Sequence, residues 1–289
     1  MAHLFPRPQS IVTTGSASFR LGRPVRLTDP TDCKLLAEFF VSHGGLTDKK
    51  GAPVVTVEIV PAIKGAYDYR LKGYENEAYC LSIKKKRIEI KAVTEVGVIR
   101  AAQTMAQLAE GEKGERRTLE AVEITDWPAF KLRGYLHDVG RSFISIEELM
   151  HEIDLLSRFK VNTFHFHLTE NQAWRFEVRR YPKLTESMTR FQGMYYTQEQ
   201  CRELEEYAAQ RGVVVIPEID MPGHSAAFER AMGCEMQSEE GMAILQDILE
   251  EVAEVFVRAP YIHIGADEKR IYNDSFLKTM TDKVHSLGK

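Results

Sequence analysis

Hydrophobic and polar residues alternate with different periods in the two halves of the chain. In the first half, residues 54–60 and 77–84 have strand-like compositions, and residues 87–92 alternate polar and apolar side chains as a half-buried strand does. Residues 94–110 instead repeat their apolar side chains at helical spacing. The pattern predicts a small α+β domain over residues 1–123, with a sheet covered on one face by helices.

From residue 124 onwards, strand-like segments alternate with amphipathic helices. The predicted strands are residues 132–139, 162–168, 213–218 and 261–265. The predicted helices begin at Ser145 and cover residues 197–211, 239–257 and 272–287. Ser145 is followed three residues later by Glu148, which indicates a capping box. Four strand–helix units in succession predict a parallel sheet and an α/β fold.

Polar residues follow the end of each of these strands. They are Arg141 after the first, Glu170, Asn171 and Trp174 after the second, Asp220 and His224 after the third, and Asp267 and Glu268 after the fourth. Parallel α/β folds bind their ligands at this edge. A continuous strand would point the last two carboxylates to opposite faces, so we expect a loop that brings both into one cleft. Such a pair suits acid–base chemistry on a glycosidic bond.

Composition narrows the choice of partners. The 289 residues carry a net charge of −4, which predicts no broad surface for nucleic acid or an anionic membrane. The basic run 84–87 separates two predicted strands and is interpreted as a solvated hairpin turn. No apolar run approaches the ~20 residues of a membrane span, and no signal peptide is visible. The sequence as it stands therefore predicts a cytoplasmic protein, with a signal that lies outside this sequence as the alternative.

Cysteine and histidine spacing gives no indication of a metal centre. The four cysteines are far apart and form neither a zinc pattern nor a disulfide framework. His165 and His167 share one face of a predicted strand, where packed and hydrogen-bonded histidines are the favoured interpretation. No set of three ligands is expected to converge at the strand ends. We therefore expect no metal and no cofactor, and a metal-dependent barrel hydrolase is the weaker alternative.

Five motifs carry a resemblance to a known family. They are LRGYLHDVGR (132–141), FHFHLTENQAW (164–174), YYTQE (195–199), VIPEIDMPGH (215–224) and HIGADE (263–268). In order and spacing they resemble the family 20 glycoside hydrolases, the β-N-acetylhexosaminidases. The resemblance implies a TIM-type (β/α)8 barrel from residue 124 to 289. Residues 1–123 are similar to the α+β domain that precedes that barrel.

The resemblance also implies a reaction. Members of the family remove a terminal, non-reducing β-linked GlcNAc or GalNAc with retention, and the sugar's own 2-acetamido oxygen attacks the anomeric carbon. Glu268 stands at the acid–base position and needs a raised pKa, while Asp267 would stay ionised and orient the acetamido N–H. Arg141 matches a residue that binds sugar hydroxyls, and His224 matches a histidine near the acid–base residue.

The other candidates have more modest expected roles. Glu170 replaces the aspartate that is usual in the family and reaches one methylene further, so we expect it to orient the histidine–acid network from a shifted position. Trp174 either packs at the barrel rim or contacts sugar. Asp138 and Glu218, inside their strands, are expected to be buried members of a polar network.

The length of the chain adds an alternative. A full barrel takes about 250 residues, and the ~165 residues after the first domain suffice for about four strand–helix units. We therefore expect a barrel truncated after its first half, completed by a second copy or a complementary C-terminal half, or else a catalytically inactive carbohydrate-binding or assembly module. The expected partner is a glycan with a terminal β-linked N-acetylhexosamine.

Overall fold

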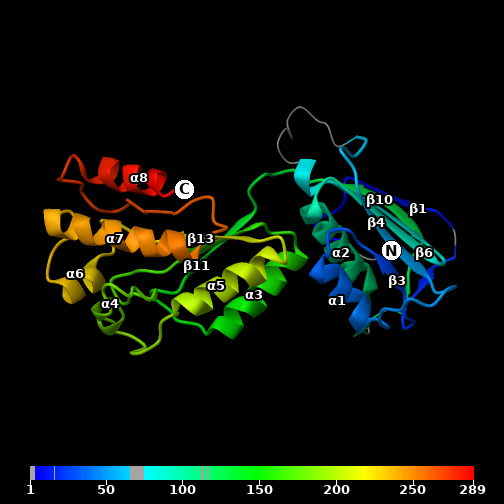
Figure 1. Cartoon of the computed structure of the whole chain (residues 1–289), viewed down its shortest axis with the longest axis horizontal. Helices are drawn as coiled ribbons and strands as arrows, with labels where there is room; N and C mark the ends of the chain where they lie inside the picture. The colour runs from blue at the N-terminus through cyan, green and yellow to red at the C-terminus, as the bar shows by residue number, and fades with distance from the viewer. Residues whose placement is uncertain (1–3, 16, 66–74, 112–113, 116) are drawn as a thin grey trace. The chain divides into compact units, whose positions relative to one another are not determined.

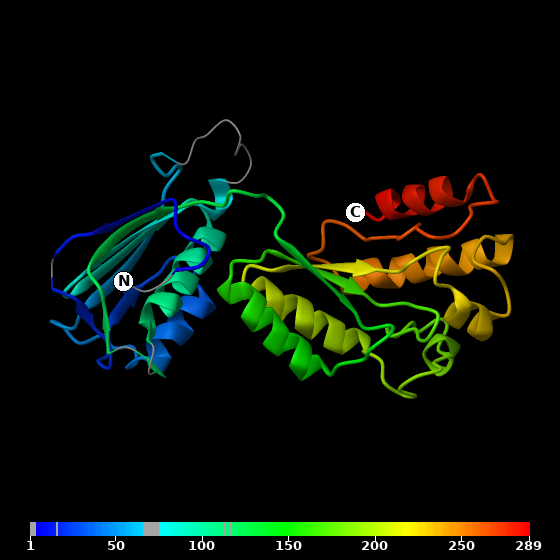
Figure 2. The same cartoon turned by 180° about the vertical axis from the view of Figure 1, so that it is seen from behind.

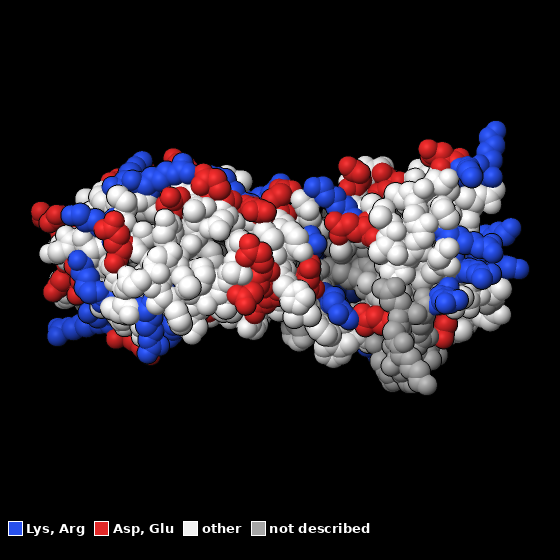
Figure 3. Space-filling view, turned by 90° about the horizontal axis from the view of Figure 1, so that it is seen from below, with Lys and Arg blue, Asp and Glu red and all other residues white. Residues whose placement is uncertain are grey.

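The computed structural model describes residues 4–15, 17–65, 75–111, 114–115 and 117–289, and it divides into two compact units (Figure 1). Unit 1 contains Met1–Arg133, Asp154–Asn162 and Gln210–Gly212, and unit 2 contains Gly134–Ile153, Thr163–Ala209 and Val213–Lys289. Over the described ranges, no helix is both long and apolar enough to cross a membrane. Lys and Arg side chains are interspersed with Asp and Glu on the face drawn in Figure 3.

Unit 1 is built on a mixed six-stranded sheet in the order β1-β10-β5-β6-β4-β3. Its strands are β1 (Ser10–Thr13), β3 (Arg26–Thr28), β4 (Val54–Ile59), β5 (Tyr79–Lys84), β6 (Arg87–Ala92) and β10 (Val122–Asp126). Two small sheets pair β2 (Phe19–Arg20) with β9 (Thr118–Leu119) and β7 (Glu110–Gly111) with β8 (Gly114–Glu115). Lys84 pairs with Arg87 across an antiparallel hairpin, which confirms the predicted basic turn.

Two helices, α1 (Lys34–Ser42) and α2 (Glu95–Ala109), cover one face of this sheet, as the sequence predicts (Figure 1). Thr94 caps α2, because its hydroxyl accepts a hydrogen bond from the Val96 N–H at 3.2 Å. Strand β5 begins two residues later than predicted, since Glu75–Glu77 forms a 3-10 turn (η2). That turn places the Glu77 carboxylate inside the unit.

Unit 2 contains a parallel sheet in the order β11-β12-β13. Its strands are β11 (Gly134–Asp138), β12 (Thr163–His167) and β13 (Val214–Glu218). The register sets Asp138, His167 and Glu218 level with one another. The residues that follow the three strands therefore meet at one edge of the sheet.

The prediction of a fourth strand over residues 261–265 is wrong, because this segment does not form a regular strand. The segment lies beside β13 but forms a single parallel bridge, in which the His263 N–H donates to the Pro217 carbonyl at 2.9 Å and the Ile219 N–H to His263 at 3.1 Å. One end of the ladder stops because Pro217 has no N–H to donate. At the other end the backbone leaves the strand conformation at Gly265, which has a φ of +65°.

Helices connect and cover the strands of unit 2 (Figure 2). They are α3 (Ile146–Arg158), α4 (Lys183–Glu186), α5 (Gln198–Ala209), α6 (Ala226–Met232), α7 (Glu239–Val255) and α8 (Phe276–Ser286). The capping box before α3 is confirmed, since the Ser145 N–H donates to the Glu148 carboxylate at 2.8 Å and the Glu148 N–H to the Ser145 hydroxyl at 3.2 Å. Figure 2 shows α3 and α5 side by side, and α7 packs against α8.

Candidate active site

A cavity of about 490 Å³ lies at the carboxyl ends of the strands in unit 2. Four of the residues predicted for the site line it, namely Arg141, His224, Asp267 and Glu268. Asp267 and Glu268 thus reach the same cleft from adjacent positions, as the expected loop requires. The remaining walls come from Leu136, Asp138, His165, His167, Glu218, Asp220, His263 and Gly265.

A chain of three side chains crosses this cavity. Glu170, only 1% exposed, places Oε1 2.5 Å from His224 Nδ1, and His224 Nε2 lies 3.4 Å from the Glu268 carboxylate. A proton on Nδ1, facing the Glu170 carboxylate, would leave Nε2 of a neutral ring as a hydrogen-bond acceptor towards Glu268. A protonated Glu268 would supply the proton for that hydrogen bond. The Glu268 side chain is 76% exposed, so the described residues do not provide the burial that would raise its pKa as the acid–base role requires.

Arg141 is fixed at the rim of the cavity by two carboxylates. Its Nη1 donates to Asp138 at 2.6 Å, and its Nη2 pairs with Glu170. About half of the Arg141 side chain is exposed, so the guanidinium remains accessible to a ligand. Glu170 therefore contacts both Arg141 and His224. Its side chain, one methylene longer than the aspartate usual in the family, lies between these two candidate site residues.

The loop that carries His224 and the loop that carries the acidic pair both have unusual backbone conformations. His224, Ala266 and Glu268 have φ values of 47°, 84° and 54°, in the left-handed region that non-glycine residues rarely adopt. The loops also approach closely, because a Cβ on Gly223 would lie 2.8 Å from the Asp267 carbonyl oxygen. Residues held in this region cluster at functional sites in proteins.

In the wall of the cavity, the Glu218 carboxylate contacts three histidine rings. Its carboxylate lies 2.7 Å from His165 Nε2, 2.6 Å from His167 Nδ1 and 3.0 Å from His263 Nδ1. Burial alone would raise the pKa of Glu218, but the hydrogen bonds from the three rings outweigh it and hold that pKa well below its usual range. The hydrogen bond from His263 to Glu218 raises the pKa of His263. Burial lowers the pKa of His167, but the hydrogen bond from His167 to Glu218 outweighs burial and raises that pKa. Glu218 is thus a buried member of a polar network, as predicted, whereas Asp138 is half-buried and pairs with Arg141 instead.

Asp220 is the second buried carboxylate of the cavity. It is 1% exposed, and burial together with the neighbouring Glu218 charge raises its pKa. Its Oδ1 occupies the space where a Cβ on Gly265 would stand, at 1.8 Å, and Gly265 has a φ of +65°. Only glycine fits at this position.

These groups also form possible metal-ligand sets. Ligand atoms lie within 4.8 Å of one another in three sets: His165, Glu218 and His263; His167, Glu218 and Asp220; and Asp220, His224 and Asp267. The expectation that no three ligands converge was therefore wrong. The histidine pair on β12 was visible in the sequence, but its spacing does not show that Glu218 on β13 lies beside it. The contribution of His263 depends on the bridge to β13.

Trp174 is not brought into the cavity. It is 1% exposed and its ring packs against Phe228, with 6.3 Å between ring centroids. In this position it packs beneath the loop after β12 and does not line the described cavity. Asn171 lies beside His224, and its side-chain oxygen accepts the Ala226 N–H at 3.2 Å.

Two models of one family match consecutive parts of the chain. "Glycosyl hydrolase family 20, domain 2" matches residues 1–127, and "Glycosyl hydrolase family 20, catalytic domain" matches residues 130–240. The chain belongs to glycosyl hydrolase family 20. The catalytic-domain match stops before Asp267 and Glu268, which the fold nevertheless brings to the same cavity as Arg141 and His224.

Named relatives of this family 20 chain are β-hexosaminidases. It is 38% identical over 228 residues to the Beta-hexosaminidase of Porphyromonas gingivalis, covering 67% of this chain and 29% of the relative. It is 35% identical to the Beta-hexosaminidase of Vibrio furnissii, covering 66% of this chain and 37% of the relative. The chain thus spans about a third of the length of these curated relatives.

Solved structures of the family match almost the whole chain. The β-N-acetylhexosaminidase of Bacteroides fragilis superimposes with a TM-score of 0.83 at 27% identity, covering 99% of this chain and 65% of that one. An exo β-N-acetylglucosaminidase of Vibrio harveyi gives a TM-score of 0.83 at 26% identity, covering 99% and 53%. The catalytic fold of these family 20 enzymes is a TIM barrel, so the expected fold family is confirmed.

Proposed function

We propose that this chain contributes the active centre of a β-N-acetylhexosaminidase, which removes a terminal, non-reducing β-linked GlcNAc or GalNAc from a glycan with retention of configuration. Family membership and the named relatives support this activity. Unit 2 would correspond to the N-terminal part of the TIM barrel of the longer relatives, which agrees with its parallel sheet.

The observation that carries the proposal is the chain Glu170–His224–Glu268 beside Arg141 and Asp267 on one cavity. Glu268 would protonate the glycosidic oxygen as the bond to the anomeric carbon breaks. The acetamido oxygen of the substrate would form the new bond to that carbon, which leaves an oxazolinium ion. Water activated by Glu268 would then open this ring, and its proton would return to the carboxylate.

The remaining residues would hold the substrate and orient the acid. Asp267 would stay ionised, accept the acetamido N–H and stabilise the positive charge that develops on the oxazoline ring. Arg141 would donate to the sugar hydroxyls with the part of its guanidinium that Asp138 and Glu170 leave exposed. His224 would keep the Glu268 carboxyl oriented, and Glu170 would fix the His224 ring.

The test is release of p-nitrophenol from p-nitrophenyl β-GlcNAc by the purified chain. Glu268→Gln is expected to reduce the rate by at least ~100-fold, the low end for a positioned acid–base group. Glu254→Gln is the matched control, since Glu254 is an exposed carboxylate on α7 outside the cavity. An equal effect of both variants would refute the role of Glu268.

Two further outcomes separate the alternatives. A specific rate that rises with chain concentration would indicate that a second copy completes the cavity. A folded chain that binds GlcNAc but releases no p-nitrophenol would favour the carbohydrate-binding module over the enzyme.

A further inference from the structure

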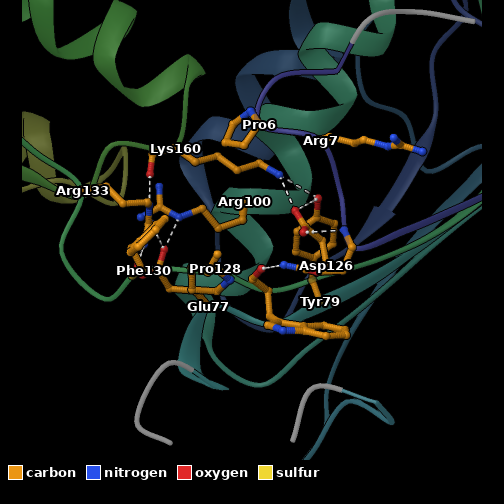
Figure 4. A pocket seen from close by; sticks show the side chains of 13 residues that line it. Pro6, Arg7, Glu77, Tyr79, Arg100, Asp126, Pro128, Phe130, Arg133 and Lys160 are labelled. Atoms are coloured by element: carbon orange, nitrogen blue, oxygen red, sulfur yellow. Dashed lines mark hydrogen bonds and ion pairs between the residues drawn. The ribbon is translucent and has the colours of Figure 1, made fainter. Parts of the chain in front are cut away.

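A second cavity, of about 220 Å³, lies wholly within unit 1 and contains a cluster of buried charges (Figure 4). The buried members are Glu77 from η2, Arg100 from α2, Asp126 at the end of β10 and Lys160 after α3, each at least nine-tenths buried. Arg133 joins them with a side chain 17% exposed. None of these residues lines the candidate active site.

The cluster has more positive than negative charge. Glu77 accepts from both Arg100 Nε at 2.6 Å and Arg133 Nη2 at 2.5 Å, and Asp126 pairs with Lys160 at 2.7 Å (Figure 4). Three cations thus share two carboxylates where water is largely excluded. Burial, and then the charges of the two arginines, lower the pKa of Lys160 against the attraction of Asp126. Each cation faces a carboxylate, but three positive charges against two negative ones leave one positive charge in excess, which a further anion would neutralise.

Some N–H groups of these three cations have no hydrogen-bond acceptor among the described residues. Lys160 donates to Tyr79 at 3.0 Å and to Asp126, which leaves one of its three N–H groups without an acceptor among the described residues. Arg100 and Arg133 each make three hydrogen bonds. Over the described parts of the chain, two of the five N–H groups of each guanidinium have no acceptor.

The backbone at Lys160 points to a use for its side chain. The Lys160 N–H donates to Ser157 and the Val161 N–H to Leu156, the hydrogen bonds of a Schellman motif that ends α3. Lys160 occupies the left-handed position of that motif with a φ of 59°, where glycine is the usual residue. A lysine is conformationally unfavourable at this position. The position nevertheless places the Lys160 ammonium group in the cavity, which a glycine could not do.

The other walls are mostly apolar and set the size and character of a ligand. Pro6, Trp127, Pro128 and Phe130 line the cavity beside the charged residues. The cavity has the volume that roughly seven water molecules occupy in liquid water. It is smaller than the ~300 Å³ of the smallest pockets that bind drug-sized ligands. We propose that this cavity binds a small organic anion, with a carboxylate head held by Lys160 and Arg133 and a short apolar body against Trp127 and Phe130.

Isothermal titration of the full chain with butyrate tests the proposal, with butyramide as an uncharged ligand of the same shape and with ionic strength held constant by chloride. Saturable binding of one butyrate per chain is expected. Butyramide is expected to bind at least about tenfold more weakly, which corresponds to 1.4 kcal/mol. Equal binding of the two ligands, or no saturable binding of butyrate, would overturn the proposal.

A paired substitution separates loss of binding from loss of folding. Lys160→Met combined with Asp126→Asn removes the cation without leaving its carboxylate partner charged, and Lys85→Met, on the exposed hairpin turn, is the control. Butyrate affinity should fall at least about tenfold in the paired variant and stay unchanged in the control. In crystals soaked with 4-bromobutyrate, the bromine anomalous signal should lie in this cavity. A signal only elsewhere on the protein would contradict the assignment, whether or not the paired variant folds.

Discussion

Replacing Gly265 by alanine tests how tightly the candidate site is built. The new Cβ would lie 1.8 Å from Asp220 Oδ1, and the residue would have to keep a φ of +65°. The left-handed backbone costs about 1–2 kcal/mol, and displacing a packed, buried carboxylate adds about 1–3 kcal/mol. The free energy of unfolding should therefore fall by about 2–5 kcal/mol.

Gly233 provides a matched control in the same unit. It ends α6 with a φ of +74°, and a Cβ there would meet no atom within 4 Å. The free energy of unfolding of Gly233→Ala should fall only by the cost of the left-handed backbone, about 1–2 kcal/mol. Equilibrium urea unfolding of both variants gives the difference, and the buried Trp174 serves as a fluorescent reporter of unit 2. Losses equal to within about 0.5 kcal/mol, the usual additivity error, would refute the crowding of Asp220.

Two further predictions concern the carboxylates around the histidines. The pKa of Glu218 is depressed in the folded state, so its contribution to stability is fully present above about pH 4.3 and is lost as the pH falls. The pKa values of His167 and His263 are raised in the folded state, so the contribution of these histidines to stability is fully present below about pH 6.5 and is lost as the pH rises. Glu218→Gln should flatten both slopes in urea unfolding measured between acidic and alkaline pH, and unchanged slopes would contradict the network. The 2.5 Å contact between Glu170 and His224 predicts a slowly exchanging Nδ1–H proton of His224 in the NMR spectrum of the unaltered chain. Glu170→Asp withdraws the carboxylate by roughly one 1.5 Å carbon–carbon bond and should abolish that signal. A signal that persists in the variant would contradict the contact.

Local patterns in the sequence predicted most of the regular elements. Alternation located β6 as observed, and the serine–glutamate spacing located the start of α3, because side-chain alternation and capping depend on neighbours in sequence. The convergence of Arg141 and Glu268 on one cavity also followed, since parallel strands end at one edge.

Long-range pairing explains what the sequence did not predict. Residues 261–265 have the composition of a strand, but the missing N–H belongs to Pro217, which only the register brings opposite that segment. Trp174 packs against Phe228, from α6, so its burial depends on a contact between separate helices and loops. The meeting of Lys160 with Asp126 likewise joins residues that have no local relationship.

The left-handed conformations of His224, Ala266 and Glu268 affect how a ligand would be bound. Each such residue costs roughly 1–3 kcal/mol, and that free energy is spent when the chain folds. A ligand that meets the loops already in this conformation does not have to reorganise them, so less of its contact energy is lost on binding. The strained backbone is thus a form of preorganisation, in which reduced folding stability is exchanged for a fixed geometry of the acidic pair.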